Sequence, residues 1–160
     1  MSKIGFIGLG IMGKPMAKNL LKAGVELLVC DLNEEAVKEV TMAGAETGSY
    51  AQIGEQCEII FLILPNGDIS KSVLFDENGV ASALTPGKIV CDMSSVTPVE
   101  SKECFDRLME QGVGFVDAPV SGGEPGAVGG TLAFMAGGRQ EDFDALTPYF
   151  EIMGSSAVRI

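Results

Sequence analysis

The chain begins with a short, mostly apolar run that ends in three closely spaced glycines. Gly8, Gly10 and Gly13 have the spacing G-x-G-x-x-G, and a helix-forming run follows them directly. A second apolar run, residues 25–30, is closed by Asp31, eighteen positions after Gly13. A strand, a glycine turn, a helix and a second strand ending in an acid form the arrangement that binds a dinucleotide. The order of these elements therefore predicts a dinucleotide site at the start of the chain.

Each glycine of this motif has a physical role. Gly8 makes the tight turn, Gly10 lets the backbone approach a pyrophosphate, and Gly13 lets the helix lie close to the strand. The pyrophosphate is expected to sit on unpaired N–H groups at the helix N-terminus. The alternative is a glycine turn that only packs a helix against a strand.

Asp31 bears on the choice of cofactor. A carboxylate at this position accepts hydrogen bonds from the ribose hydroxyls and repels a 2′-phosphate, and neither Leu32 nor Asn33 supplies a cation for one. We therefore expect NAD as the cofactor, with NADP less favoured. The alternative role for Asp31 is a solvated N-cap of the helix predicted to follow it.

Composition narrows the class of protein. The 160 residues suit one domain, and 46% apolar with 21% charged residues supports a folded core. The net charge of −11 argues against nucleic acid or an anionic membrane as a partner. The N-terminus enters a strand directly and no run is long enough to span a bilayer, so we expect neither a signal peptide nor a membrane anchor.

The cysteines and the absence of histidine argue against a metal site. The four cysteines form no C-x-x-C pair, and the sequence has no histidine. We interpret the cysteines as small core residues of a reduced, cytoplasmic protein. A nucleophilic cysteine remains the alternative, although no activating base adjoins any of them. The residues concerned are Cys30, Cys57, Cys91 and Cys104.

Apolar runs alternate with helical patterns along the chain. This alternation predicts an α/β fold with a doubly wound, mostly parallel Rossmann-type sheet and helices on both faces. Segment 121–130 is expected to be the only long irregular segment. The predicted strands cover residues 4–7, 26–30, 58–64, 88–92, 114–117, 131–136 and 157–160. The predicted helices cover residues 15–23, 34–43, 49–55, 69–74, 98–111 and 142–150, with Ser49 and Thr97 as N-caps.

Ligands of such sheets bind beyond the carboxyl ends of the strands. Five loops are expected at that edge, and each alone could be a plain turn. Together they favour a ligand site. Ser94 or Ser95 could cap the helix after the fourth loop, but Thr97 is the better cap, which leaves the Ser95 hydroxyl for a cofactor. The loops cover residues 8–13, 31–33, 64–67, 92–95 and 117–123.

Two stretches resemble signatures of the β-hydroxyacid dehydrogenases. They are G-F-I-G-L-G-I-M-G-K-P-M-A-K-N-L at residues 5–20 and D-A-P-V-S-G-G-E-P-G-A at residues 117–127, followed by G-T-L at residues 130–132. The family includes 3-hydroxyisobutyrate dehydrogenase, tartronate semialdehyde reductase and 6-phosphogluconate dehydrogenase. The resemblance covers essentially the whole chain and is strongest to the tartronate semialdehyde reductases, through residues 11–16, 64–66 and 92–95.

The resemblance implies roles for individual residues. Ser121, Gly122 and Gly123 match the segment that holds the substrate carboxylate, where successive N–H groups and a hydroxyl can form an anion cradle. The implied cofactor-binding residues are Gly8, Leu9, Gly10, Ile11, Met12, Gly13, Asp31, Leu32, Leu64, Pro65, Asn66 and Ser95.

One departure from the family limits what this chain is expected to do. The family's general acid/base is a lysine on the helix after the Rossmann domain, and the sequence stops at Ile160, about where the preceding turn would begin. We therefore expect residues 1–160 to be an NAD(P)-binding domain without the family's helical C-terminal domain and without a catalytic residue. We also expect the cut edge, with Phe134, Phe150 and residues 157–160, to expose an apolar patch that self-associates.

The resemblance implies hydride transfer between a nicotinamide cofactor and a small β-hydroxyacid or semialdehyde, in a full-length protein that is a homo-oligomer. Three alternatives stay open. The first is a cofactor-binding module without catalysis of its own. The second is a parent protein of the 3-hydroxyisobutyrate or succinic semialdehyde type of reductase. A methyltransferase that holds S-adenosylmethionine on the glycine loop is the third, and segments 64–66 and 121–123 argue against it.

Overall fold

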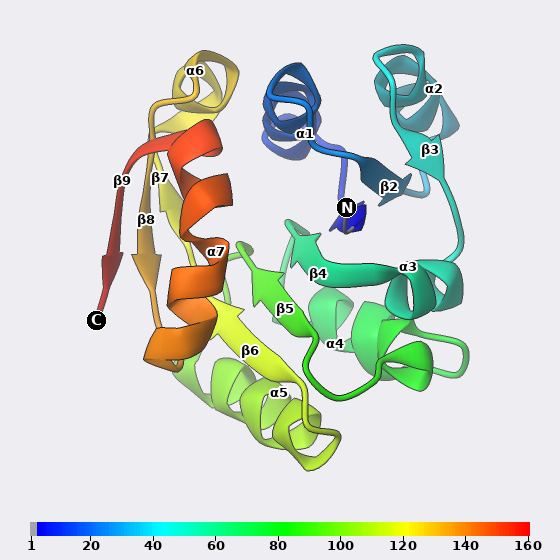
Figure 1. Ribbon diagram of the computed structural model, residues 1–160, viewed down its shortest axis with the longest axis vertical. Coiled ribbons are helices and arrows are strands. Elements are labelled where there is room, and N and C mark those ends of the chain that lie inside the picture. The colour runs from blue at the N-terminus through cyan, green and yellow to red at the C-terminus, as the bar shows by residue number, and fades with distance from the viewer. Residues whose placement is uncertain (1–2) are drawn as a thin grey trace.

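Six parallel strands form the main sheet of the computed structural model, which describes residues 3–160 (Figure 1). The chain adds strands outward from β1 on one side, then crosses back to place β4 on the other side of β1. Such a reversal marks the point where these sheets bind ligands. The predicted doubly wound sheet is thus confirmed. The order across it is β3 (Glu46–Thr47), β2 (Leu27–Cys30), β1 (Lys3–Ile7), β4 (Cys57–Leu62), β5 (Ile89–Asp92) and β6 (Gly114–Asp117).

Helices cover both faces of this sheet. One apolar cluster joins the sheet to α1 (Gly13–Lys22), α2 (Glu34–Met42) and α7 (Gln140–Met153). A second cluster joins the opposite face to α3 (Tyr50–Gln56), α4 (Gly67–Phe75), the 3-10 helix η1 (Val80–Ala83) and α5 (Pro98–Glu110). Figure 1 shows the two groups on opposite sides of the strands.

Side-chain caps fix where several helices begin. Ser49 and Thr97 form capping boxes with Gln52 and Glu100, as the sequence predicted for the two caps. Asn33 caps α2 by accepting two backbone N–H groups, so the alternative in which Asp31 caps that helix is wrong. Asp31 is thereby left for another role.

A small mixed sheet lies beside the main one. It pairs β7 (Val120–Ser121) antiparallel to β8 (Leu132–Ala136), and β8 parallel to β9 (Gly154–Arg159). Between β7 and β8 the chain forms α6 (Gly123–Gly129), so the prediction that residues 121–130 are irregular is wrong. Packing overrides the low helix propensity of its glycines, because Ala127 is buried and its carbonyl accepts a hydrogen bond from Asn19 on α1 at 2.9 Å.

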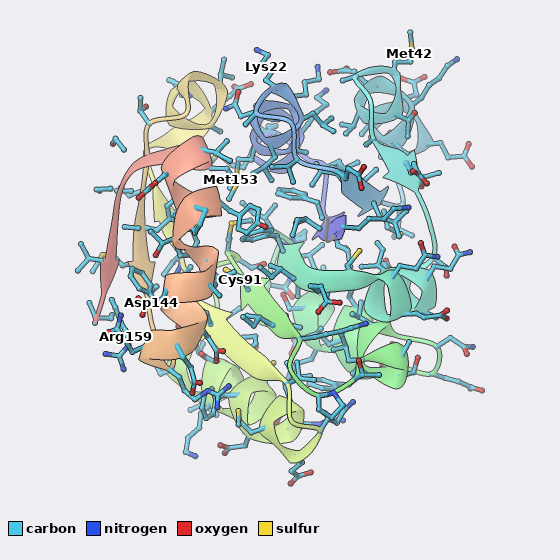
Figure 2. All side chains as sticks on the ribbon, in the orientation of Figure 1. Lys22, Met42, Cys91, Asp144, Met153 and Arg159 are labelled. Atoms are coloured by element: carbon cyan, nitrogen blue, oxygen red, sulfur yellow. The ribbon has the colours of Figure 1, made fainter. Side chains whose placement is uncertain are left out.

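The interior is apolar, and it contains two aromatic rings that were expected on the surface. Phe134 and Phe150, expected on an exposed patch, are each 1% exposed and stack on each other with ring centroids 4.5 Å apart. They are buried because they fill the space between β8 and α7. Figure 2 shows the buried Cys91 in the interior, whereas the exposed Met42 projects from α2. In the described part of the chain no helix has the length and apolar character to cross a bilayer.

Candidate dinucleotide site

The glycine loop joins β1 to α1, and its three glycines contribute in different ways. Gly8 has a φ of +105°, and a side chain there would overlap the carbonyl of Ile63. A Cβ at Gly13 would overlap the Gly8 carbonyl oxygen, so only glycine lets α1 start this close to β1. A Cβ at Gly10 would meet nothing within 4 Å. Gly10 therefore leaves open space above the loop, where a ligand can approach the backbone.

The N-terminus of α1 is open to an acceptor. No side chain among the described residues 3–160 caps this helix. The N–H groups of Gly10, Ile11, Met12 and Gly13 donate to no acceptor within residues 3–160. Unpaired N–H groups at the positive end of a helix dipole favour an anion. The loop thus has the chemistry of a phosphate site.

Asp31 closes the loop from the end of β2. Its Oδ2 accepts the N–H of Leu9 at 2.6 Å, and its Oδ1 accepts the N–H of Asn33 at 2.7 Å. The residue is half-buried, so the carboxylate still faces solvent on one side. A carboxylate has about four acceptor positions. Acceptor positions of the Asp31 carboxylate therefore remain for the hydroxyls of a ribose.

Two cavities meet at this edge of the sheet. One, of about 510 Å³, extends from Asp31 and Leu32 to α4, and the other, of about 330 Å³, lies on the glycine loop. Both are lined by Gly8, Asp31, Leu64 and Pro65, so they form one continuous groove across the ends of β1, β2 and β4. Ile11, Met12 and Gly13 line the loop end of this groove. Leu9 lines a neighbouring cavity instead.

Three residues that line the groove were not predicted from the sequence. Tyr50, Ile69 and Val73 line the larger cavity. Tyr50 directly follows the Ser49 cap, and Ile69 and Val73 are four residues apart on α4. The sequence predicted a helix over residues 69–74, but only the fold shows that part of this helix lines a groove. Burial raises the pKa of the Tyr50 hydroxyl, with smaller contributions from Cys30 and Asp31.

A serine next to the predicted one holds the loop after β4. The buried Ser94 hydroxyl accepts the N–H of Leu64 at 2.7 Å, and the Ser94 N–H donates to Asp92 Oδ1 at 2.9 Å. Ser95 is exposed and lines neither cavity of the groove. Asn66 caps α4 through its side chain, which accepts the N–H of Ile69. The cofactor contacts expected for Ser95 and Asn66 stay predictions.

The predicted carboxylate cradle lies near the glycine loop. Ser121, Gly122 and Gly123 are exposed at the end of β7 and the start of α6, and both glycines have positive φ, +133° and +60°. The next residue, Glu124, lines a cavity together with Gly10. Figure 1 shows α6 beside α1. The substrate role of the segment stays a prediction.

The cysteines have the character of core residues. Burial raises the pKa of all four thiols, to about 11 for Cys57 and Cys104 and well above the ordinary value for Cys91. Cys30, next to Asp31, is raised by burial and then by that carboxylate. Such thiols are protonated at neutral pH, which argues against a cysteine nucleophile. Within residues 3–160, no three His, Cys, Asp or Glu side chains gather as metal ligands.

A parallel sheet with a glycine loop and an acid at its switch point defines the class of dinucleotide-binding α/β domains. Residues 3–160 match the family described as the NAD binding domain of 6-phosphogluconate dehydrogenase. The chain therefore belongs to this family, the NAD-binding domains of the β-hydroxyacid dehydrogenases, and the resemblance drawn from the sequence is confirmed.

Several characterised proteins are similar over nearly the whole chain. The 2-hydroxy-3-oxopropionate reductase of Escherichia coli is 42% identical over 154 residues, which are 96% of this chain and 53% of the relative. Human mitochondrial 3-hydroxyisobutyrate dehydrogenase is 38% identical over 156 residues, 97% of this chain and 46% of the relative. A structure of Mycobacterium tuberculosis 3-hydroxyisobutyrate dehydrogenase with L-serine has a TM-score of 0.93 at 30% identity, covering 99% of this chain and 54% of that one. The chain thus spans about half the length of the curated relatives it matches.

Proposed function

We propose that the groove binds NAD in preference to NADP, and that residues 1–160 form the cofactor domain of a β-hydroxyacid dehydrogenase. The observation that carries the proposal is the uncapped start of α1, where four N–H groups beside the Asp31 carboxylate find no partner among residues 3–160. The open space over Gly10 fits the approach of a pyrophosphate. Asp31 would receive the ribose hydroxyls and repel a 2′-phosphate.

The remaining contacts follow from the residues that line the groove and, for Asn66 and Ser95, from the resemblance to the family. The adenosine half would lie in the larger cavity, between Leu32, Tyr50 and the α4 face. The pyrophosphate would rest on the loop from Gly8 to Gly13. Leu64, Pro65 and Asn66 would run along the cofactor, with Ser95 near its nicotinamide half. When bound, the nicotinamide supplies or accepts the hydride.

For the whole protein we propose a small β-hydroxyacid or semialdehyde as substrate, its carboxylate held by Ser121, Gly122 and Gly123. The identity to the 2-hydroxy-3-oxopropionate reductase supports a substrate of the tartronate semialdehyde type. The 3-hydroxyisobutyrate type is the alternative, because relatives of that name are nearly as similar. The four free thiols support a reducing, cytoplasmic location, and we propose a homo-oligomer for the full-length protein.

The proton of the substrate hydroxyl would need a donor from outside this chain. In the part of the chain that the structure describes, no lysine lines either cavity of the groove. Lys88 is buried and donates to the carbonyls of Gly54 and Glu55, both at 2.7 Å, at the end of α3. Lys102 pairs with Asp106 on α5. We therefore propose that the chain alone binds the cofactor and catalyses little.

Calorimetry with the purified chain tests the proposal. NADH should bind saturably at one site per chain, and ADP-ribose should compete with it because it shares the adenosine diphosphate half. S-adenosylmethionine should neither bind nor compete. No heat with NADH, or binding of S-adenosylmethionine in its place, would refute the proposed function.

A further inference from the structure

A third cavity, of about 620 Å³, adjoins the proposed cofactor groove. It lies along α1, between α2 and α6, and Figure 1 shows α1 flanked by these two helices. Its walls include Gly10, Ile11 and Asn33, so it opens at the glycine loop. Three lysines and three glutamates also line it, namely Lys14, Lys18, Lys22, Glu35, Glu39 and Glu124.

This cavity borders the position expected for a ribose 2′-substituent. Asp31 hydrogen-bonds the N–H groups of Leu9 and Asn33, and both of those residues line the cavity. The Asp31 carboxylate therefore stands between the groove and the cavity. A phosphate on the 2′-hydroxyl would pass this carboxylate and meet the cavity walls, where NADP-dependent domains place a cation.

Cations are present there, but one carboxylate holds two of them. Lys14 lies one helical turn from the loop, since its N–H donates to the Gly10 carbonyl at 3.0 Å. Its Nζ pairs with Glu39 Oε1 at 3.2 Å, and Lys18 Nζ pairs with Glu39 Oε2. These two contacts hold the pKa of Glu39 below its ordinary value, and the contact with Lys18 has the larger effect. The glutamate remains charged and keeps both ammonium groups turned toward α2.

We propose that Glu39 is a specificity-determining residue that excludes NADP. By pairing with Lys14 and Lys18, it withholds from a 2′-phosphate two of the three lysines that line this cavity. The cavity is then a phosphate subsite in which two of the three lysines are already paired with a carboxylate, and Asp31 and Glu39 discriminate against the same group from two sides. The inference rests on the proposed NAD site and adds a second determinant to it.

A double-mutant cycle on NADPH affinity tests this coupling. The four proteins are wild type, Glu39→Gln, Lys14→Met and the double variant, each titrated with NADH and NADPH. Glu39→Gln should tighten NADPH binding by about threefold to fivefold, the size of a partly exposed ion pair, and leave NADH affinity within about twofold. Lys14→Met should change NADPH affinity little in wild type and reduce the gain in the Glu39→Gln background, where Lys18 alone remains released.

Glu35→Gln is the matched control, because Glu35 lines the same cavity and no lysine or arginine of residues 3–160 pairs with it. Its effect on NADPH should be smaller and independent of Lys14. An unchanged NADPH affinity in Glu39→Gln, or an equal gain with and without Lys14, would overturn the inference while NADH still binds. Failure of NADH to bind wild type would instead refute the dinucleotide site itself, and the inference with it.

Discussion

The Asp31 carboxylate accepts the backbone N–H of Leu9 at 2.6 Å, which fastens the end of β2 to the glycine loop after β1. Its second oxygen accepts the N–H of Asn33 at 2.7 Å. One side chain thus fixes the loop, the start of the α2 turn and its own orientation. The acid proposed to recognise the ribose is therefore held in place before any ligand binds, which lowers the entropic cost of binding.

Because of this arrangement, Asp31→Asn is the substitution that best separates the charge of Asp31 from its hydrogen bonds to the loop. Wild type should bind NADH more tightly than NADPH by about 1–3 kcal/mol, as Coulomb's law gives for a carboxylate and a phosphate at an effective dielectric constant of about 20. Asp31→Asn keeps one acceptor oxygen for the loop but loses the charge, so this difference should shrink. Isothermal titration of both cofactors measures it. Equal affinities in wild type would contradict the assignment of Asp31.

Gly10 and Gly13 offer a matched pair of substitutions. Gly10→Val places a side chain in open space, so the fold should survive while NADH affinity falls at least about tenfold, because the pyrophosphate can no longer approach the loop. Gly13→Val drives a Cβ into the Gly8 carbonyl and should lower the free energy of unfolding by several kcal/mol. Urea unfolding and NADH titration separate the two effects. Normal NADH binding by a folded Gly10→Val protein would show that the loop does not hold the pyrophosphate.

Much of this site could be predicted because its signals are local. The glycine spacing, the apolar runs and the acid after β2 each report on a few neighbouring residues, and together they place the loop at the switch point. The strands β3 and β7 were missed because each has two residues and is defined by its partners, Leu28 to Glu46 and Val120 to Phe134 for example. Three glycines in seven residues concealed α6, which depends on its packing against α1.

The residues missed at the site depend on contacts between distant segments. Ser94 and Ser95 are chemically identical neighbours, and only the fold shows that the first is buried under the Leu64 loop while the second is exposed. Tyr50 and Ile69 come to the groove from helices that the sequence predicted without indicating what they face. The pairing of Glu39 with two lysines likewise joins α2 to α1.

Asp92 should make stability depend on pH in the sense opposite to a paired carboxylate. It is 1% exposed, and burial raises its pKa above the ordinary value, against the lowering effect of the hydrogen bonds from Ser94 and Ser70. A raised folded-state pKa means that its contribution is fully present below the unfolded pKa, about 4, and is lost as pH rises through the folded pKa. Asp92→Asn, which keeps an acceptor for the Ser94 N–H, should therefore gain stability relative to wild type as pH rises from about 4 to 7.

Urea unfolding of both proteins across this range measures the difference. The same change at the exposed Asp144, labelled on α7 in Figure 2, controls for the loss of one charge from an acidic protein. A difference between wild type and Asp92→Asn that does not vary with pH would show that the carboxylate is not penalised by burial.

The chain alone should reduce tartronate semialdehyde with NADH only at trace rates. Loss of a general acid/base costs about 10²–10⁴-fold, and loss of substrate enclosure costs more. NADH absorbance at saturating cofactor measures turnover, with the Gly10→Val protein as the background. Turnover near about 10 s⁻¹, an ordinary value for enzymes, would mean that a residue of this chain serves as the acid.

The outer face of the small sheet should mediate self-association, through the predicted segment 157–160 together with Met135 and not through the buried Phe134 and Phe150. Met135 on β8 and Val158 on β9 are register partners and are 55% and 56% exposed, and Ile160 beyond them is 73% exposed. Within residues 3–160, β9 pairs only with β8, so its other edge is free to pair with a second strand. Exposed apolar side chains beside a free strand edge favour association at micromolar concentration, once salt of about 0.15 M screens the acidic surfaces.

Sedimentation velocity should show this concentration-dependent association. Val158→Lys should weaken the association. Val99→Lys, at a 78% exposed position on α5, should leave it unchanged. A monomer at all concentrations, or equal effects of the two lysines, would show that this face does not associate.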